Sequence, residues 1–160
     1  MEEKMKVVSF TSLPVWQQKL IFDADEARRH SSSPYSKFKV GAAIQCSQPN
    51  TDPVVVYLGC NVENAMYVVT HAEQAAINEA CLNEPEKPYI IAIAVVLPAE
   101  TIDQHALPCG YCRQWIREFG SDDTLVLGAK LNSAGDIWQV EVVTLEELLP
   151  FSFGPNNLGK

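Results

Sequence analysis

The sequence predicts an α/β fold of three layers, α/β/α, in which a mixed five-stranded sheet lies between helices. Helix-like and strand-like segments alternate along the chain, a pattern typical of a sheet covered by helices. Residues 89–97 are almost continuously apolar, as expected for a strand buried on both faces. A length of 160 residues suits one domain, residues 1–160, that can bury a real core.

The first half of the chain is predicted to hold two helices and two strands. Residues 13–30 and 71–82 have helical patterns, and the second of these has an alanine-rich apolar side. Strands are expected at residues 38–45 and 54–58. The polar segment 47–53, which contains two prolines, is predicted to be the turn between these strands.

The second half continues the alternation after the buried strand. Residues 109–119 are predicted to form a helix. Two further strands, residues 124–131 and 137–143, are expected on either side of a polar turn at residues 133–136. Residues 145–149 complete the fold as a short helix.

Charge and hydropathy weigh against two classes of partner. The net charge is −8, whereas a nucleic-acid binder needs a positive surface that replaces phosphate counterions. Lysine and arginine are few and dispersed along this chain. No apolar run approaches the roughly 20 residues that a membrane helix needs. We therefore expect neither a nucleic-acid partner nor a membrane partner.

The N-terminus and the cysteines indicate a reducing compartment. Residues 1–4 do not resemble a secretory signal, which has a basic flank followed by an apolar run. A cytoplasmic protein is expected, and its five cysteines are then metal ligands or core residues rather than disulfides. Cys46, Cys60 and Cys81 lie outside any metal-binding motif and are expected to be small buried hydrophobic residues.

Two short segments carry the residues of a metal site: His71-Ala72-Glu73 and Pro108-Cys109-Gly110-Tyr111-Cys112. Each is predicted to begin a helix. Two cysteines three apart on a helix face the same way, and the helix N-terminus favours the thiolates that bind metals. One histidine and two cysteines leave a fourth position for water, which is the arrangement of catalytic zinc.

Glu73 follows His71 by two residues, so it lies outside the ligand set but close to a metal-bound water. A carboxylate there can take a proton from water and pass it to a ring nitrogen and a leaving group. The combination of His-x-Glu with Pro-Cys-x-x-Cys is the signature by which zinc deaminases are known, so the assignment is a match to that signature.

Each motif alone has another interpretation. A Cys-x-x-Cys pair is more often a structural zinc site or a redox site, and an isolated His-x-Glu is common by chance. The two motifs occur together here, with Pro108 before the first cysteine and a helical pattern after each motif. This combination favours the catalytic interpretation.

From about residue 33 to residue 158, the sequence resembles the cytidine deaminase family. The resemblance rests on several motifs in the family's order: PYSKFKVGAA at residues 34–43, GCNVENA at residues 59–65, the two zinc segments, Arg113-Gln114, and LLPFSFGP at residues 148–155. The family fold is a mixed sheet between helices, which agrees with the fold predicted from the chain itself.

The resemblance implies a role for each matching residue. His71, Cys109 and Cys112 match the ligands of one zinc ion per chain, and Glu73 matches the proton shuttle. The implied substrate contacts are Phe38 against the pyrimidine ring, Asn61 and Glu63 on the ribose hydroxyls, the backbone near Ala72 and Pro108 at the base edges, and Phe153 from a neighbouring subunit. Without the resemblance, Phe38 would be assigned to a strand core, and Asn61 and Glu63 would be polar residues at a strand end.

The metal motif departs from that of short family members, which use three cysteines and place an arginine after the catalytic glutamate. Here the first ligand is His71, and Gln74 follows Glu73, in the style of longer two-domain members. Two thiolates and a neutral imidazole leave the zinc site uncharged, so no arginine is required beside it. The resemblance implies a homotetramer, with a dimer as the alternative.

The expected reaction is zinc-dependent hydrolytic deamination of cytidine and deoxycytidine to uridine and deoxyuridine, as in pyrimidine salvage. A first alternative is deamination of another amino-heterocycle nucleoside, such as an antibiotic or modified nucleoside, or of a free base. A second is editing of RNA or DNA, against which the acidic composition argues. A third is a structural zinc module without catalysis, against which the presence of Glu73 argues.

Overall fold

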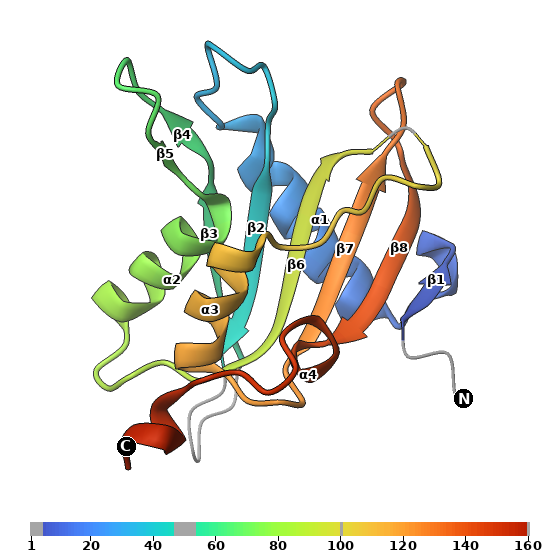
Figure 1. Cartoon of the computed structure of the whole chain (residues 1–160). Coiled ribbons are helices and arrows are strands. Elements are labelled where there is room, and N and C mark those ends of the chain that lie inside the picture. Colours follow the sequence, from blue (N-terminus) through green and yellow to red (C-terminus); the bar gives the residue numbers. More distant parts are fainter. Residues whose placement is uncertain (1–4, 47–53, 100, 160) are drawn as a thin grey trace.

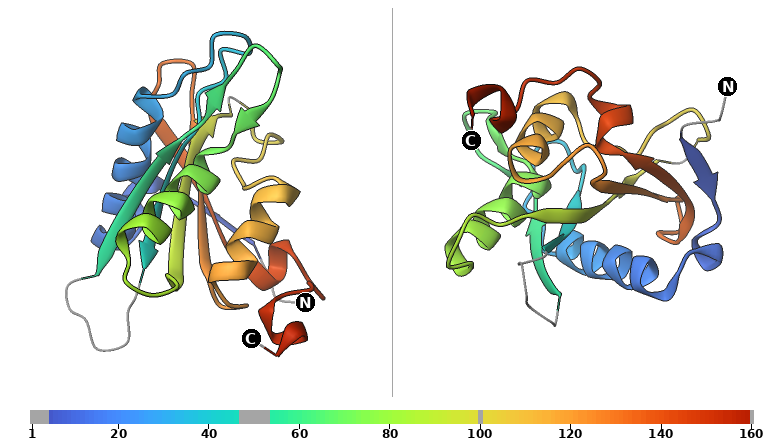
Figure 2. Two further views of the ribbon diagram at one scale, coloured as in Figure 1. Left: turned by 90° about the vertical axis from the view of Figure 1, so that its left-hand side faces the viewer. Right: turned by 90° about the horizontal axis from the view of Figure 1, so that it is seen from below.

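The computed structural model describes residues 5–46, 54–99 and 101–159 of the chain. These residues form the predicted α/β fold of three layers, with a mixed sheet between helices (Figures 1 and 2). Helix α1 (Val15–Arg29) covers one face of the sheet, and α2 (Ala72–Asn83) and α3 (Gly110–Phe119) cover the other. Among the described residues, no helix combines the length and the apolar character needed to cross a membrane.

The main sheet has six strands in the order β1-β8-β7-β6-β2-β3. Only β6 and β7 run parallel, and the other neighbouring strands are antiparallel. The strands are β1 (Lys6–Val8), β2 (Gly41–Cys46), β3 (Val55–Cys60), β6 (Ile90–Pro98), β7 (Leu125–Leu131) and β8 (Ile137–Thr144). A small separate hairpin consists of β4 (Val62–Glu63) and β5 (Val69–Thr70), and the short helix α4 (Leu145–Leu148) follows β8.

The prediction of five strands was wrong by one. Strand β1 has three residues and joins the sheet only by pairing with β8, so no local hydrophobic period reveals it. The predicted strand at residues 38–45 begins at Gly41 instead, because Lys37 has a positive φ of 60° and turns the chain away. The predicted turn at residues 47–53 lies outside the described residues.

Each face of the sheet contributes to its own apolar core. Leu20, Ile21 and Ala24 of α1 pack on one face, and the alanines of the central strands lie beneath them. Ala72, Ala76 and Ile77 of α2 pack on the opposite face. Residues 92–96 of β6 are buried throughout, which confirms the expectation of a strand covered on both sides.

Glycine brings α2 into close contact with the sheet. A Cβ atom added to Gly59 of β3 would lie 2.2 Å from the carbonyl oxygen of Ala72 and 2.4 Å from the amide nitrogen of Ala76. No side chain fits into this space, so only glycine allows the first turn of α2 to lie directly on β3. This contact fixes the position of the helix start that carries His71 and Glu73.

Strand β3 is the last strand on its side of the sheet. The backbone N–H of Leu58 donates a hydrogen bond of 2.6 Å to Glu79 Oε2 of α2. Glu84, the C-cap residue directly after α2, accepts a hydrogen bond of 2.6 Å from the Tyr57 hydroxyl. Carboxylates from the helix side therefore hold both the backbone and a side chain of this edge strand.

Candidate metal and substrate site

Two helix N-termini bring the predicted metal ligands together. His71 is the N-cap residue of α2, Cys109 is the N-cap residue of α3, and Cys112 lies in the first turn of α3. One donor atom from each of these three side chains lies within 4.8 Å of the others. Cys109 Sγ and His71 Nδ1 are 3.5 Å apart. Residues 38 positions apart in the sequence thus form one cluster.

The chemistry of this cluster fits zinc. An imidazole and two thiols are the donor types that zinc prefers, and three of them leave one coordination position open. Cys112 is fully buried, and its burial, followed by the proximity of Glu73, raises the pKa of its thiol well above the usual value. A divalent cation reverses that effect, because it stabilises the thiolate. The buried thiol is therefore suited to a bound metal.

Glu73 lies beside the cluster without belonging to it. Its side chain is buried, and this burial raises the pKa of the carboxyl above its usual value. The start of α2 thus holds two groups close together: an imidazole at His71 and a buried carboxyl at Glu73.

A cavity of about 390 Å³ opens onto this cluster. Besides the metal-site residues, its lining holds Phe38, Asn61, Glu63 and Ala72, all of which the sequence had assigned to substrate contact. Pro108 is buried next to Cys109 but is not among the lining residues. The complete lining is Ser36, Phe38, Val40, Asn61, Glu63, Val69, His71, Ala72, Glu73, Leu97, Leu107 and Cys109.

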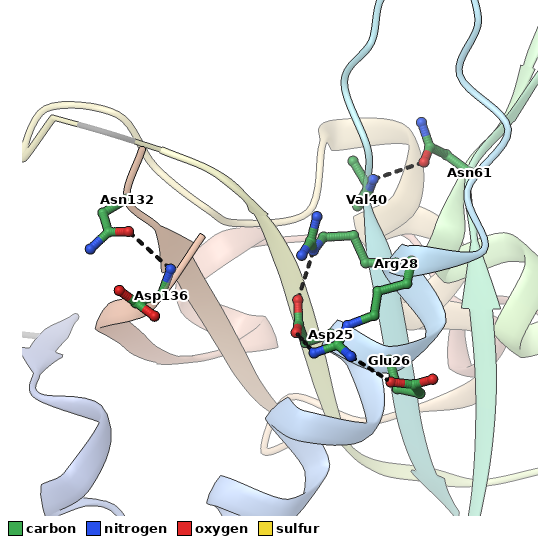
Figure 3. A network of polar contacts seen from close by, with 8 residues as sticks. Asp25, Glu26, Arg28, Val40, Asn61, Asn132 and Asp136 are labelled. Carbon is green, nitrogen blue, oxygen red and sulfur yellow. Dashed lines mark hydrogen bonds and ion pairs between the residues drawn. The ribbon is translucent and has the colours of Figure 1, made fainter. Parts of the chain in front are cut away.

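Asn61 fixes the segment that carries Phe38. Its Oδ1 accepts hydrogen bonds from Ser31 Oγ at 2.6 Å and from the Val40 amide at 2.8 Å, the second of which is drawn in Figure 3. Its Nδ2 donates to the Phe38 carbonyl at 2.8 Å. The buried amide is thus anchored before any substrate binds, a function that the sequence pattern did not predict.

Glu63 stabilises the same loop through hydrogen bonds to residues that precede Phe38. Its carboxylate accepts hydrogen bonds from the amides of Tyr35 and Ser36, at 3.0 and 3.1 Å, and from the Ser36 hydroxyl. The bond from the Ser36 hydroxyl is the main cause that lowers the pKa of Glu63 below its usual value. Ser36 Oγ also accepts from the Phe38 amide at 3.0 Å. Ser36 is a cavity residue that the sequence analysis missed, because a serine in a loop has no distinctive pattern.

Phe38 itself lies in the loop before β2 rather than within a strand, as noted above. Its side chain is 44% exposed and lines the cavity. An aromatic ring left partly open to solvent at a cavity wall is available for stacking, whereas a ring in a strand core is not.

The comparisons with known proteins agree with this geometry. The family model for the cytidine and deoxycytidylate deaminase zinc-binding region matches residues 14–129, a range that includes His71, Glu73, Cys109 and Cys112. The chain belongs to this deaminase family. The matched region is the zinc-binding region of the family, and the cluster of His71, Cys109 and Cys112 is a group of donors suitable for one metal ion.

Relatives in this family align over most of the chain. The cytidine deaminase of Sporosarcina psychrophila is 37% identical over 88% of this chain and 93% of its own length. That of Halalkalibacterium halodurans is 39% identical over 86% of this chain and 93% of its own length. The crystal structure of cytidine deaminase from Burkholderia pseudomallei is 38% identical, with a TM-score of 0.66 over 84% of this chain and 97% of that one.

The C-terminal tail of this family member lies apart from the cavity. Phe153 is 60% exposed, and within the described residues it does not line the cavity of its own subunit. Its carbonyl accepts a hydrogen bond of 2.9 Å from Gln114 Nε2 of α3. Phe151 is fully exposed and has a positive φ of 55°. The side chains of Phe151 and Phe153 are therefore largely exposed to solvent in the single chain.

The remaining cysteines differ from the expectation of uniform burial. Cys46 is buried, Cys60 is half-buried, and Cys81 is exposed. For Cys81 the prediction was wrong, because the apolar side of α2 is narrow and the residue after Ala80 points outward. All five cysteines are free thiols.

Proposed function

We propose that this protein catalyses hydrolytic deamination of cytidine and deoxycytidine: each nucleoside reacts with water to give uridine or deoxyuridine and ammonia. The observation that carries the proposal is a cavity lined by His71 and Cys109 of the donor cluster and by Glu73, with Asn61 and Glu63 also in its lining as polar groups for a sugar. The relatives named above are cytidine deaminases, which supports the same reaction here.

In this proposal, His71, Cys109 and Cys112 hold one zinc ion. When bound, zinc supplies Lewis acidity that lowers the pKa of water toward neutrality. Glu73 accepts one proton from the water whose oxygen adds to C4, and donates it to N3 of the pyrimidine ring. It then accepts the remaining proton of the new C4 hydroxyl and donates it to the 4-amino group, so that the C4–N bond breaks, ammonia leaves and the C4 carbonyl forms. Its burial keeps bulk water from competing for these proton transfers.

The substrate contacts follow from free hydrogen-bonding capacity. The Asn61 amide group has two N–H donors, and one of them is engaged with the Phe38 carbonyl. The Glu63 carboxylate has about four acceptor positions, and three of them are engaged within the loop. Each residue thus retains capacity for one ribose hydroxyl. The Phe38 ring stacks on the pyrimidine, and the backbone near Ala72 and Pro108 contacts the edges of the base.

The proposed assembly is a cytoplasmic homotetramer, with a dimer as the alternative, in which Phe153 of one subunit closes the cavity of its neighbour. Exposed Phe151 and Phe153 support this proposal, because large exposed aromatic patches are typical of interaction surfaces. The five free thiols suit the reducing conditions of the cytoplasm.

The test is an ultraviolet assay of the purified protein with cytidine, together with the variant Glu73→Gln. We expect the wild type to convert cytidine and the variant to retain about one zinc per chain while losing several orders of magnitude in turnover. Proton transfer alone contributes ~10²–10⁴-fold, and here one carboxyl serves several transfers. Zinc content is measured in both proteins. Turnover near the wild-type rate by zinc-loaded Glu73→Gln would refute the assignment.

A further inference from the structure

A buried pair of opposite charges lies on the sheet, outside the cavity. Lys130 of β7 is 1% exposed, and Glu141 of β8 is 0% exposed. The distance between Lys130 Nζ and Glu141 Oε1 is 3.2 Å. Taking two charges out of water is costly, and the proposed reaction uses neither residue. Their other contacts therefore need an explanation.

These contacts all go to the segment that connects β6 to α3. Glu141 Oε2 accepts a hydrogen bond of 2.8 Å from the Ala106 amide, and Glu141 Oε1 lies 2.6 Å from His105 Nδ1. Lys130 Nζ donates to the Ile102 carbonyl at 3.2 Å. In Figure 1 this segment crosses the sheet in front of β7 before it enters α3. The charge pair thus binds the backbone of residues 102–106, which form neither a helix nor a strand.

The segment lies directly on the sheet beside the pair. Gly128 of β7 is paired with Glu141, and a Cβ atom added to Gly128 would lie 2.7 Å from the Ala106 carbonyl oxygen. Ala106 is fully buried. From Ala106 only two residues separate this contact from Cys109, so the position of the segment determines where α3 begins.

We propose that Lys130 and Glu141 are positioning residues for the metal site. They hold the backbone at Ile102 and Ala106 against the sheet and thereby fix the position of Cys109. The inference rests on the proposed role of Cys109 as a zinc ligand. Two apolar side chains of similar size would fill the same space, but they could neither accept the Ala106 N–H nor donate to the Ile102 carbonyl.

The central experiment replaces the pair by apolar residues in the variant Lys130→Met/Glu141→Leu. We expect the zinc-free variant to remain folded and to unfold at a urea concentration close to that of the wild type, because removal of two costly buried charges offsets the loss of the acceptor for the Ala106 amide. The zinc-loaded variant should release zinc to a chromophoric chelator at least about tenfold faster, which is the usual scale for loss of groups that support metal ligands. With cytidine, kcat should fall more than KM changes.

Two further variants separate positioning from general stability. Lys130→Met/Glu141→Gln restores a carbonyl acceptor for the Ala106 amide and should return zinc release most of the way to the wild-type rate. Lys87→Met/Glu118→Leu makes comparable changes in a half-exposed surface pair and should leave zinc release unchanged. If the apolar buried pair released zinc at the wild-type rate, the proposal would be overturned.

Gly128→Ala provides an independent test if the apolar double variant does not fold. It displaces the same segment with both charges intact, and it should also accelerate zinc release about tenfold. A folded Gly128→Ala protein that releases zinc at the wild-type rate would contradict the proposal. Zinc release is measured without substrate. A wild type that binds zinc but leaves cytidine unchanged would therefore refute only the proposed reaction.

Discussion

At the scale of single residues, Glu63 stabilises the loop before β2 even in the absence of a substrate. Its carboxylate is already bonded to Tyr35 and Ser36, and the lowered pKa keeps it charged throughout the neutral range. A fixed negative charge at the cavity rim favours a neutral nucleoside over a nucleotide, because a phosphate would be repelled.

For Glu63→Ala we expect kcat/KM for cytidine to fall roughly tenfold or more, because a hydroxyl in the complex loses a charged acceptor. Free cytosine, which has no sugar, should be a poor substrate for the wild type and should be affected less by the substitution. Ser36→Ala is the matched control, since it removes a loop contact but keeps the carboxylate. Equal losses for cytidine and cytosine would mean that Glu63 acts only on the loop. Cytidine monophosphate processed as fast as cytidine would contradict the charge argument.

A second prediction concerns the thiols. Burial raises the pKa of Cys46 to about 12, so at pH 8 only about one thiol in ten thousand is ionised and alkylation should be very slow. The reactive thiolate fraction grows as the pH rises toward this pKa. Cys81 also has a raised pKa, but its side chain is exposed. Iodoacetamide treatment of the folded protein, followed by peptide mass spectrometry, should label Cys81 well before Cys46. Similar labelling rates for both, without unfolding, would contradict the burial of Cys46.

At the scale of secondary-structure elements, the contact between α2 and β3 at Gly59 offers a direct test. In Gly59→Ala the new Cβ meets backbone atoms of Ala72 and Ala76, which cannot rotate away. We expect a loss of about 1–3 kcal/mol in the free energy of unfolding, together with reduced turnover because His71 and Glu73 shift with the helix. Urea denaturation and the cytidine assay measure the two effects.

Gly110→Ala is the control for stability, since a Cβ at Gly110 has open space around it. It should leave the free energy of unfolding unchanged or raise it slightly, because alanine favours helices over glycine. If Gly59→Ala were as stable as Gly110→Ala, the close contact between α2 and β3 would not be as described.

The sequence could predict the helices and strands that have a hydrophobic pattern of their own. The helices that begin after His71 and Cys109 and the buried strand at Ile90–Pro98 were located within one or two residues. Strand β1 and the β4–β5 hairpin were not, because strands of two or three residues are stabilised by their partners rather than by a local pattern.

The clustering of His71, Cys109 and Cys112 could be predicted because their spacing forms a motif. The contacts of Ser36, Lys130 and Glu141 could not. Lys130 and Glu141 are charged residues in strands of otherwise mainly apolar composition. Such a position can equally face solvent, and only the folded chain shows that both side chains are buried against the backbone of residues 102–106.

At the scale of the whole molecule, shared active sites predict complementation between defective chains. Phe153→Ala and Glu73→Gln proteins are purified separately, mixed under conditions of subunit exchange, and assayed with cytidine. Some mixed sites would combine Glu73 from one chain with Phe153 from the other, so activity should exceed that of either parent. A fully active monomer by light scattering at the assay concentration would rule out the shared site.

The hydrogen bond from Leu58 to Glu79 also bears on how the protein avoids unwanted polymerisation. An edge strand with free backbone donors is a template on which a strand of another molecule can be added, and this is a common beginning of aggregation. On β3 the Leu58 donor is already engaged, and a carboxylate stands where an incoming strand would need to place a carbonyl. At this position the edge is therefore closed to an incoming strand, and a second copy of the chain could pair with Leu58 only by displacing the Glu79 carboxylate.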